Sequence, residues 1–145
     1  MAKKSRPGRL RIVAGKWRSR LLDIADVDGL RPTSERIRET LFNWLAPTIA
    51  GSRCLDLCAG TGALGFEAMS RGAREVVFVE KSPLAARVLR ANAEMLEADC
   101  ADIRQDDALK FLANRPGEPF FYGLFPALRP FPGRNCQRLK SGRPA

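Results

Sequence analysis

The sequence predicts an α/β fold: a Rossmann-like parallel sheet covered by helices, with a basic ribbon and a helix before it. Two observations carry this prediction. From residue 53 onward, short apolar stretches alternate with segments of helical periodicity, which is typical of a parallel sheet. A glycine-rich turn follows the first of these stretches. With 145 residues, 45% of them hydrophobic, the chain can form one domain with a buried core.

Ahead of this pattern, residues 9–22 predict two short strands that turn at Gly15 and Lys16. Residues spaced by two lie on the same face of a strand, so the segment has one basic and one apolar face. The basic face carries Arg9, Arg11, Arg18 and Arg20, and the apolar face carries Leu10, Ile12 and Trp17.

A helix is predicted to open at Pro32 and Thr33, with Thr33 as its N-cap, and to end at Pro47. Apolar residues at helical spacing predict the face that it buries. These residues are Ile37, Leu41, Trp44 and Leu45. We interpret Trp44 as a core residue because it lies on this face.

From residue 53, strands and helices are predicted to alternate. Their ranges are 53–57, 63–71, 75–80, 83–97, 101–104 and 107–113, and a fourth strand is expected in the apolar stretch 119–125. Ser82 and Pro83 suit the N-cap and first position of the second helix. We divide the chain into residues 1–50 (ribbon and helix of the same domain), 51–125 (a cofactor-binding core) and 126–145 (a basic tail expected to be disordered).

The glycine turn predicts a cofactor site. Gly60 and Gly62 let backbone N–H groups come close to a ligand at the start of a helix. Ligands of parallel sheets bind at the carboxyl ends of the strands, where three acids fall: Asp56, Glu80 and Asp107. Glu80 is placed to accept ribose hydroxyls, and Asp107 lies where an adenine edge is expected. Asp56 either holds the cofactor or braces the loop.

An acid before the glycines favours S-adenosylmethionine as the cofactor, but alternatives exist. Residues 60–65 also satisfy the GxGxxG pattern of nicotinamide and flavin enzymes, which alone is a weak signal. Asp56 argues against a dinucleotide, because that strand position is normally apolar in dinucleotide folds. A turn without any ligand is disfavoured, because acids occur at successive strand ends.

The net charge of +9 is concentrated at the two ends of the chain. Residues 1–31 carry nine Lys/Arg and three acids, and residues 121–145 carry five Lys/Arg and no acid. Basic segments beside a near-neutral core suit a nucleic-acid partner, although a merely solubilising tail is the alternative. The candidate RNA-binding residues are Arg9, Arg11, Lys16, Arg18, Arg20 and Arg31.

Cysteine and histidine usage predicts no metal site. The chain has no histidine, and its four cysteines lack CxxC spacing, so we expect reduced core thiols in a cytoplasmic protein. No apolar run is long enough to cross a membrane, and the basic N-terminus lacks the apolar segment of a signal peptide. We expect a monomer.

Three motifs carry a resemblance to a known family: residues 11–18 (RIVAGKWR), residues 30–45 from Leu-Arg-Pro-Thr to Trp-Leu, and residues 54–65 (CLDLCAGTGALG). Together they resemble the bacterial family that methylates a guanine N2 of 16S ribosomal RNA. The resemblance implies that the acids and glycines above contact S-adenosylmethionine. It also implies that the ribbon and the Arg31-Pro-Thr turn engage ribosomal RNA or the small subunit.

The chain departs from that family after its fourth predicted strand. Methyltransferases of exocyclic amines carry an Asn/Asp-Pro-Pro-Phe/Tyr motif there, which aligns the accepting nitrogen. Here only Arg129-Pro130-Phe131 remains, and an arginine accepts no hydrogen bond. No catalytic residue is therefore identified, and impaired methyl transfer is expected. Our hypothesis is a shifted reading frame, a truncated chain or a degraded gene after about residue 122. A genuine RNA-binding tail, and a non-catalytic RNA-binding protein, are the alternatives.

Overall fold

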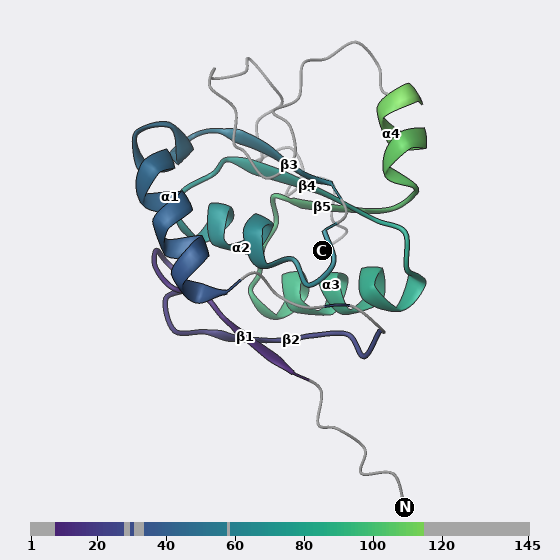
Figure 1. Cartoon of the computed structure of the whole chain (residues 1–145), viewed down its shortest axis with the longest axis horizontal. Coiled ribbons are helices and arrows are strands. Elements are labelled where there is room, and N and C mark those ends of the chain that lie inside the picture. Colours follow the sequence, from purple (N-terminus) through teal and green to yellow (C-terminus); the bar gives the residue numbers. More distant parts are fainter. Residues whose placement is uncertain (1–7, 28–29, 31–33, 58, 115–145) are drawn as a thin grey trace, which may run out of the picture.

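The computed structural model of the chain describes residues 8–27, 30, 34–57 and 59–114 (Figure 1). The elements follow the order β1 (Arg9–Arg11), β2 (Leu21–Asp23), α1 (Glu35–Ile49), β3 (Arg53–Leu57), α2 (Ala63–Ser70), β4 (Glu75–Glu80), α3 (Pro83–Met95), β5 (Ala101–Gln105) and α4 (Ala108–Asn114). The predicted fourth strand at 119–125 and the tail at 126–145 lie outside the described residues.

The centre of the fold is a parallel sheet with the strand order β3-β4-β5. Alternate residues of β4 face opposite sides, since Phe78 packs with Phe66 of α2 whereas Val77 packs with Phe111 of α4. Helices α2 and α3 lie on one face of the sheet and α4 follows β5 toward the other (Figure 1). This confirms the prediction of an α/β fold with helices on a parallel sheet.

The N-terminal ribbon is an antiparallel hairpin that forms a third layer beneath α2 and α3 (Figure 1). Its strands are shorter than predicted, and residues 12–20 connect them. The backbone bonds Ile12 N–H to Arg20 O (3.0 Å) and Ser19 N–H to Ile12 O (2.8 Å) close this connection. The apolar face is confirmed: Leu10, Ile12 and Trp17 are buried in one core cluster with Phe66. We call residues 9–23 the basic hairpin.

Both predicted ends of the first helix are wrong. Ser34, not Thr33, is the N-cap of α1, and its side chain accepts from the Ile37 N–H at 3.2 Å. The helix continues through Pro47 to Ile49. A proline lacks the N–H that would bond the Asn43 carbonyl, but both residues are exposed, so water can replace that bond.

The predicted buried face of α1 is confirmed only in part: Leu41 and Leu45 are half-buried and Leu45 packs against the core, but the assignment of Trp44 to the core is wrong. Trp44 is 77% exposed and Ile37 is 60% exposed, whereas Arg38 and Phe42 are buried. Arg38 turns inward because its guanidinium lies 4.0 Å from the carboxylate of buried Glu67. The buried face of α1 thus combines Phe42 and Ile49 with a charged residue, which apolar periodicity does not predict.

The remaining predicted elements are confirmed to within two residues. Ser82 caps α3 as expected, accepting from the Ala85 N–H at 3.3 Å, with Pro83 in the first turn. The prediction of reduced thiols holds for buried Cys54, which is in no disulfide, but is wrong for Cys100, which is disulfide-bonded. No helix within the described ranges is long and apolar enough to cross a membrane.

Candidate functional site

The carboxyl ends of β3 and β4 meet at the glycine turn that joins β3 to α2. Glu80, the last residue of β4, connects the two loops that follow these strands. Its Oε2 accepts from the Gly60 N–H at 2.6 Å, and its Oε1 accepts from the Ser82 N–H at 3.0 Å. The structure therefore brings Glu80 and the glycine turn together, 20 residues apart in the chain.

Asp56 lies under this turn, in β3. Its side chain is buried, and its Oδ2 accepts from the Gly65 N–H of α2 at 3.1 Å. Burial raises the pKa of the Asp56 carboxyl to about 7; the Gly65 bond lowers it and the nearby Glu80 charge raises it further. The group thus braces the first turn of α2 and changes its protonation near neutral pH.

Close packing requires two glycines, Gly62 at the end of the turn and Gly65 in the first turn of α2. Gly62 has a φ of +79°, and a Cβ there would lie 2.6 Å from a Leu89 methyl and 2.7 Å from the Phe66 ring. Gly65 lies against the Phe78 ring, which leaves no space for a Cβ. These residues let α2 lie directly on the sheet.

Asp107 lies one strand further along, between β5 and α4. Its Oδ1 accepts from the N–H groups of Leu109 (3.0 Å) and Lys110 (3.2 Å), so it caps the start of α4. The preceding Asp106 donates its N–H to the Glu80 carbonyl at 3.0 Å, which ties this strand end to that of β4. Asp107 therefore belongs to the same edge of the sheet, with its carboxylate engaged by the helix.

This edge has the chemical features that an adenosine-containing ligand requires. Each Glu80 oxygen accepts one N–H and has a further lone pair, so the half-buried carboxylate can also accept hydroxyl groups. The glycine turn supplies close backbone approach at the start of a helix. Both features fit the ribose and the charged end of S-adenosylmethionine.

No group of three His, Cys, Asp or Glu side chains within the described ranges could hold a metal ion. A hollow of about 630 Å³ lies beside the last turn of α3 and the start of β5, lined by residues such as Glu94 and Asp102. It lies at the amino end of β5, away from the glycine turn.

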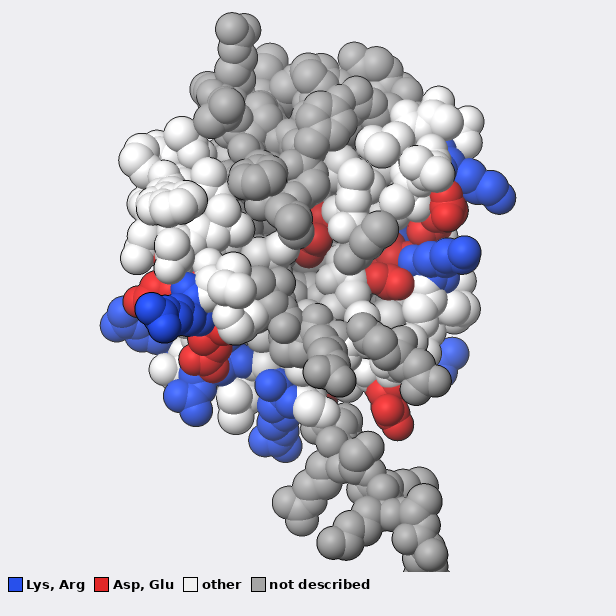
Figure 2. All heavy atoms as spheres, in the orientation of Figure 1, with Lys and Arg blue, Asp and Glu red and all other residues white. Residues whose placement is uncertain are grey.

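The candidate RNA-binding residues of the basic hairpin are all exposed: Arg9, Arg11, Lys16, Arg18 and Arg20. Basic side chains project from the lower left edge of the molecule in Figure 2, where Figure 1 places the hairpin. Lys16 Nζ lies 4.4 Å from the centre of the Trp17 ring, which orients it. Arg31 lies outside the described residues.

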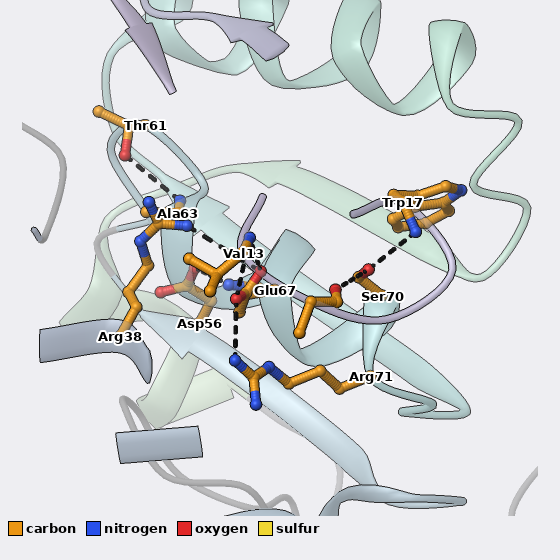
Figure 3. Close-up of polar contacts among 11 residues, drawn as sticks. Val13, Trp17, Arg38, Asp56, Thr61, Ala63, Glu67, Ser70 and Arg71 are labelled. Carbon is orange, nitrogen blue, oxygen red and sulfur yellow. Dashed lines mark hydrogen bonds and ion pairs between the residues drawn. The ribbon is translucent and has the colours of Figure 1, made fainter. Parts of the chain in front are cut away.

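Sequence reasoning missed the polar residues that hold the hairpin. Glu67 and Ser70 of α2 contact the hairpin backbone, and Asn92 of α3 holds Asp23 through its Nδ2 (2.8 Å) and Oδ1 (3.3 Å) (Figure 3 shows the α2 contacts). An acid and a serine spaced by three in the otherwise apolar helix 63–70 was a signal for buried polar contacts.

Comparison with known proteins identifies the family. The sequence model of the family described as "Conserved hypothetical protein 95" matches residues 10–122. The chain is 44% identical over 120 residues to ribosomal RNA small subunit methyltransferase D of Haemophilus influenzae, covering 81% of this chain and 62% of that protein. It is 46% identical over 108 residues to the protein of the same name from Escherichia coli K12, covering 74% and 54%. The chain thus spans between half and two thirds of the length of these relatives.

Solved structures agree with the sequence comparison. A "Putative methyltransferase" from Escherichia coli superposes with a TM-score of 0.68 at 43% identity, covering 73% of this chain and 57% of that one. A putative RNA methyltransferase from Pyrococcus horikoshii gives a TM-score of 0.53 at 27% identity, covering 59% and 45%. The fold is therefore the Rossmann-like methyltransferase fold. Because the family model covers well over half of the sequence, the chain belongs to the conserved hypothetical protein 95 family, that of the ribosomal RNA small subunit methyltransferase D proteins.

Proposed function

We propose that this chain carries the cofactor-binding part of an S-adenosylmethionine-dependent methyltransferase that acts on the N2 of a guanine in small-subunit ribosomal RNA. The observation that carries the proposal is the joining of Glu80 to the Gly60 N–H across two strand ends, in a chain of this family. The names of the relatives support the RNA substrate, and the exposed cations of the basic hairpin supply a surface for it.

In this proposal the residues at the sheet edge have separate roles. The turn at Gly60 and Gly62 receives the methionine end of the cofactor, and Glu80 accepts its ribose hydroxyls. Asp56 holds the start of α2 in place, and Asp107 borders the adenine while capping α4. S-adenosylmethionine supplies an electrophilic methyl group on its sulfonium. These groups bind and orient the cofactor, and none of them is proposed as an acid or a base.

This sequence does not supply the group that would align the accepting amine of the guanine. The segment after Tyr122 holds no Asp-Pro-Pro-Phe motif, and its residues lie outside the described ones. We therefore expect slow or undetectable methyl transfer by the chain of this sequence, together with retained cofactor binding. We propose a cytoplasmic, monomeric protein, in keeping with a ribosomal substrate.

Titration calorimetry tests the cofactor proposal. S-adenosylhomocysteine and NAD are titrated separately into the 145-residue chain, and only the first is expected to bind. Binding of NAD alone would replace the proposal with a nicotinamide enzyme. Transfer of labelled methyl groups to small-subunit RNA, measured in parallel, tests the impairment: robust turnover would contradict it.

A non-catalytic RNA-binding protein is the second candidate, because the exposed cations of the basic hairpin do not depend on the cofactor edge. It predicts RNA affinity that falls steeply with salt and no binding of S-adenosylhomocysteine. The titration with S-adenosylhomocysteine therefore separates the two candidates.

A further inference from the structure

The tip of the basic hairpin is held by two side chains of α2. Ser70 Oγ donates to the Ala14 carbonyl at 2.6 Å and accepts from the Trp17 N–H at 3.0 Å, while the Ser70 carbonyl accepts from the Lys16 N–H at 2.9 Å (Figure 3). One residue thus makes three hydrogen bonds to residues 14–17.

Glu67, one helical turn before Ser70 in α2, holds Val13, the residue that precedes this tip. Both of its carboxylate oxygens accept from the Val13 N–H, at 3.2 and 3.1 Å, and its side chain is fully buried. Arg71 approaches it at 3.3 Å and Arg38 at 4.0 Å, so the buried negative charge is paired from two helices (Figure 3). Residues 13–17 are therefore bonded along their length to the last turns of α2.

The tip also requires a glycine at the point of contact. Gly15 has a φ of +87°, and a Cβ there would overlap the carbonyl group of Ser70. The backbone of the tip therefore lies directly on the end of α2. Lys16 and Arg18, on either side of buried Trp17, remain exposed. The contact thus buries the backbone of the tip and leaves its cations accessible.

Helix α2 separates this contact from the cofactor edge. It begins after Gly62, in the glycine turn, and ends at Ser70, about 10 Å further along its axis. Residues near Ser70 can therefore disturb the hairpin tip without touching Gly60 or Glu80. The two functions assigned above are distinguishable by substitution.

We propose that Ser70 and Glu67 are positioning residues for RNA: they fix residues 13–17 so that Lys16 and Arg18 contact the phosphates of the substrate, at a surface separate from the cofactor edge. The inference rests on the proposed function, because it takes RNA to be the partner of the hairpin. It assigns a task to side chains that touch neither RNA nor cofactor.

The test compares Ser70→Ala with Ser52→Ala in the full chain. Ser52 is also buried and donates through its hydroxyl to the Ile49 carbonyl, but its hydrogen bonds are to the end of α1 and to Arg74 before β4. Binding of a transcribed small-subunit ribosomal RNA is measured over a range of salt, S-adenosylhomocysteine binding by calorimetry, and folding by thermal melting. Ser70→Ala is expected to weaken RNA binding at least fivefold and leave S-adenosylhomocysteine binding within twofold.

The salt dependence separates positioning from general destabilisation. Losing one phosphate contact lowers the slope of log affinity against log salt by about one unit, which a merely less stable protein would not show. Ser70→Ala is expected to lower this slope, and Ser52→Ala to keep it. Gly15→Ala is expected to act like Ser70→Ala. Gly51→Ala, which adds a Cβ at a φ of +74° in open space, is its control.

Lys16→Gln changes an exposed side chain, so it tests the inference even if a variant at a buried position fails to fold. It is expected to lower RNA affinity and the salt slope with unchanged melting. Wild-type RNA affinity and slope in Ser70→Ala, or in Lys16→Gln, would overturn the inference while the proposed function stands. A wild-type chain that binds neither RNA nor S-adenosylhomocysteine would overturn the proposed function, and the inference with it.

Discussion

The carboxyl group of Asp56 and the backbone N–H of Gly65 are joined by a buried hydrogen bond of 3.1 Å that ties strand β3 to helix α2. A carboxylate in this position is far from water, so its charged form is disfavoured. The Asp56 carboxyl group therefore forms a structural contact, and its charged form lowers the free energy of unfolding.

This effect of the charge predicts a pH dependence of stability. The pKa of Asp56 is about 7 in the folded chain and near 3.8 when exposed, so between these values only the folded state holds the proton. The contribution of this group to the free energy of unfolding then falls as pH rises from about 4 to 7, and stays low above that. Asp56→Asn keeps an acceptor for Gly65 and removes the charge.

We therefore expect Asp56→Asn to melt at a higher temperature than the wild type at pH 8, with the difference shrinking toward pH 5. Thermal melts of both proteins across this range check it. A difference that stays constant with pH would mean that Asp56 is already charged or already neutral throughout.

Glu80 should matter more for cofactor binding than for folding. Glu80→Ala removes the acceptors of the Gly60 and Ser82 N–H groups, and calorimetry should show at least tenfold weaker binding of S-adenosylhomocysteine, about 1.4 kcal/mol. Glu94→Ala, an exposed acid of α3, is the control and should bind normally. Equal affinities for the two variants would remove Glu80 from the site.

Gly62→Ala should lose both stability and cofactor affinity. Its Cβ would overlap Phe66 and Leu89 at a positive φ, whereas Gly51→Ala adds the same strain in open space. Urea unfolding should show a loss of about 1 kcal/mol for Gly51→Ala and a larger loss for Gly62→Ala. Similar losses would show that the turn can move away from the added methyl group.

The buried pair of Arg38 and Glu67 predicts a third stability effect. Burial lowers the pKa of Arg38, and the charge of Glu67 partly offsets this shift. Glu67→Gln removes the buried carboxylate beside the Arg38 guanidinium, at a cost of about 3–5 kcal/mol in unfolding free energy. Adding Arg38→Met removes that charge and should recover part of the loss. Urea denaturation of the two variants tests this, and a double variant less stable than Glu67→Gln would contradict it.

The sequence predicts the sheet well because its signals there are local. Strand β4, Glu75–Glu80, contains the apolar run 76–79, and Ser82-Pro83 marks the next helix start, so neither depends on distant partners. The glycine turn and Glu80 could likewise be placed at one edge, because carboxyl ends of parallel strands adjoin.

The predictions from sequence fail where a partner that is distant in sequence determines which residues are buried. Apolar spacing favoured Trp44 for the core, but the buried face of α1 carries Arg38, which is paired with Glu67, 29 residues away. The polar residues of helix 63–70 indicate buried contacts, but not that their partner is the hairpin, because the contacts of Ser70 and Asn92 span 53 and 69 residues. Periodicity reports which side chains are apolar and does not report which polar ones find buried partners.

Helix α2 has only eight residues, and both of its ends are fixed: Gly62 and Gly65 at the turn, Glu67 and Ser70 at the hairpin. Successive residues of an α-helix are separated by about 100° around the axis. Inserting or deleting one residue between positions 65 and 67 would swing the glutamate and the serine away from Val13 and Trp17. A single substitution in this helix changes one contact, whereas a change in its length would break the contacts at one of its ends. Related proteins that keep both the turn and the hairpin must therefore keep this spacing.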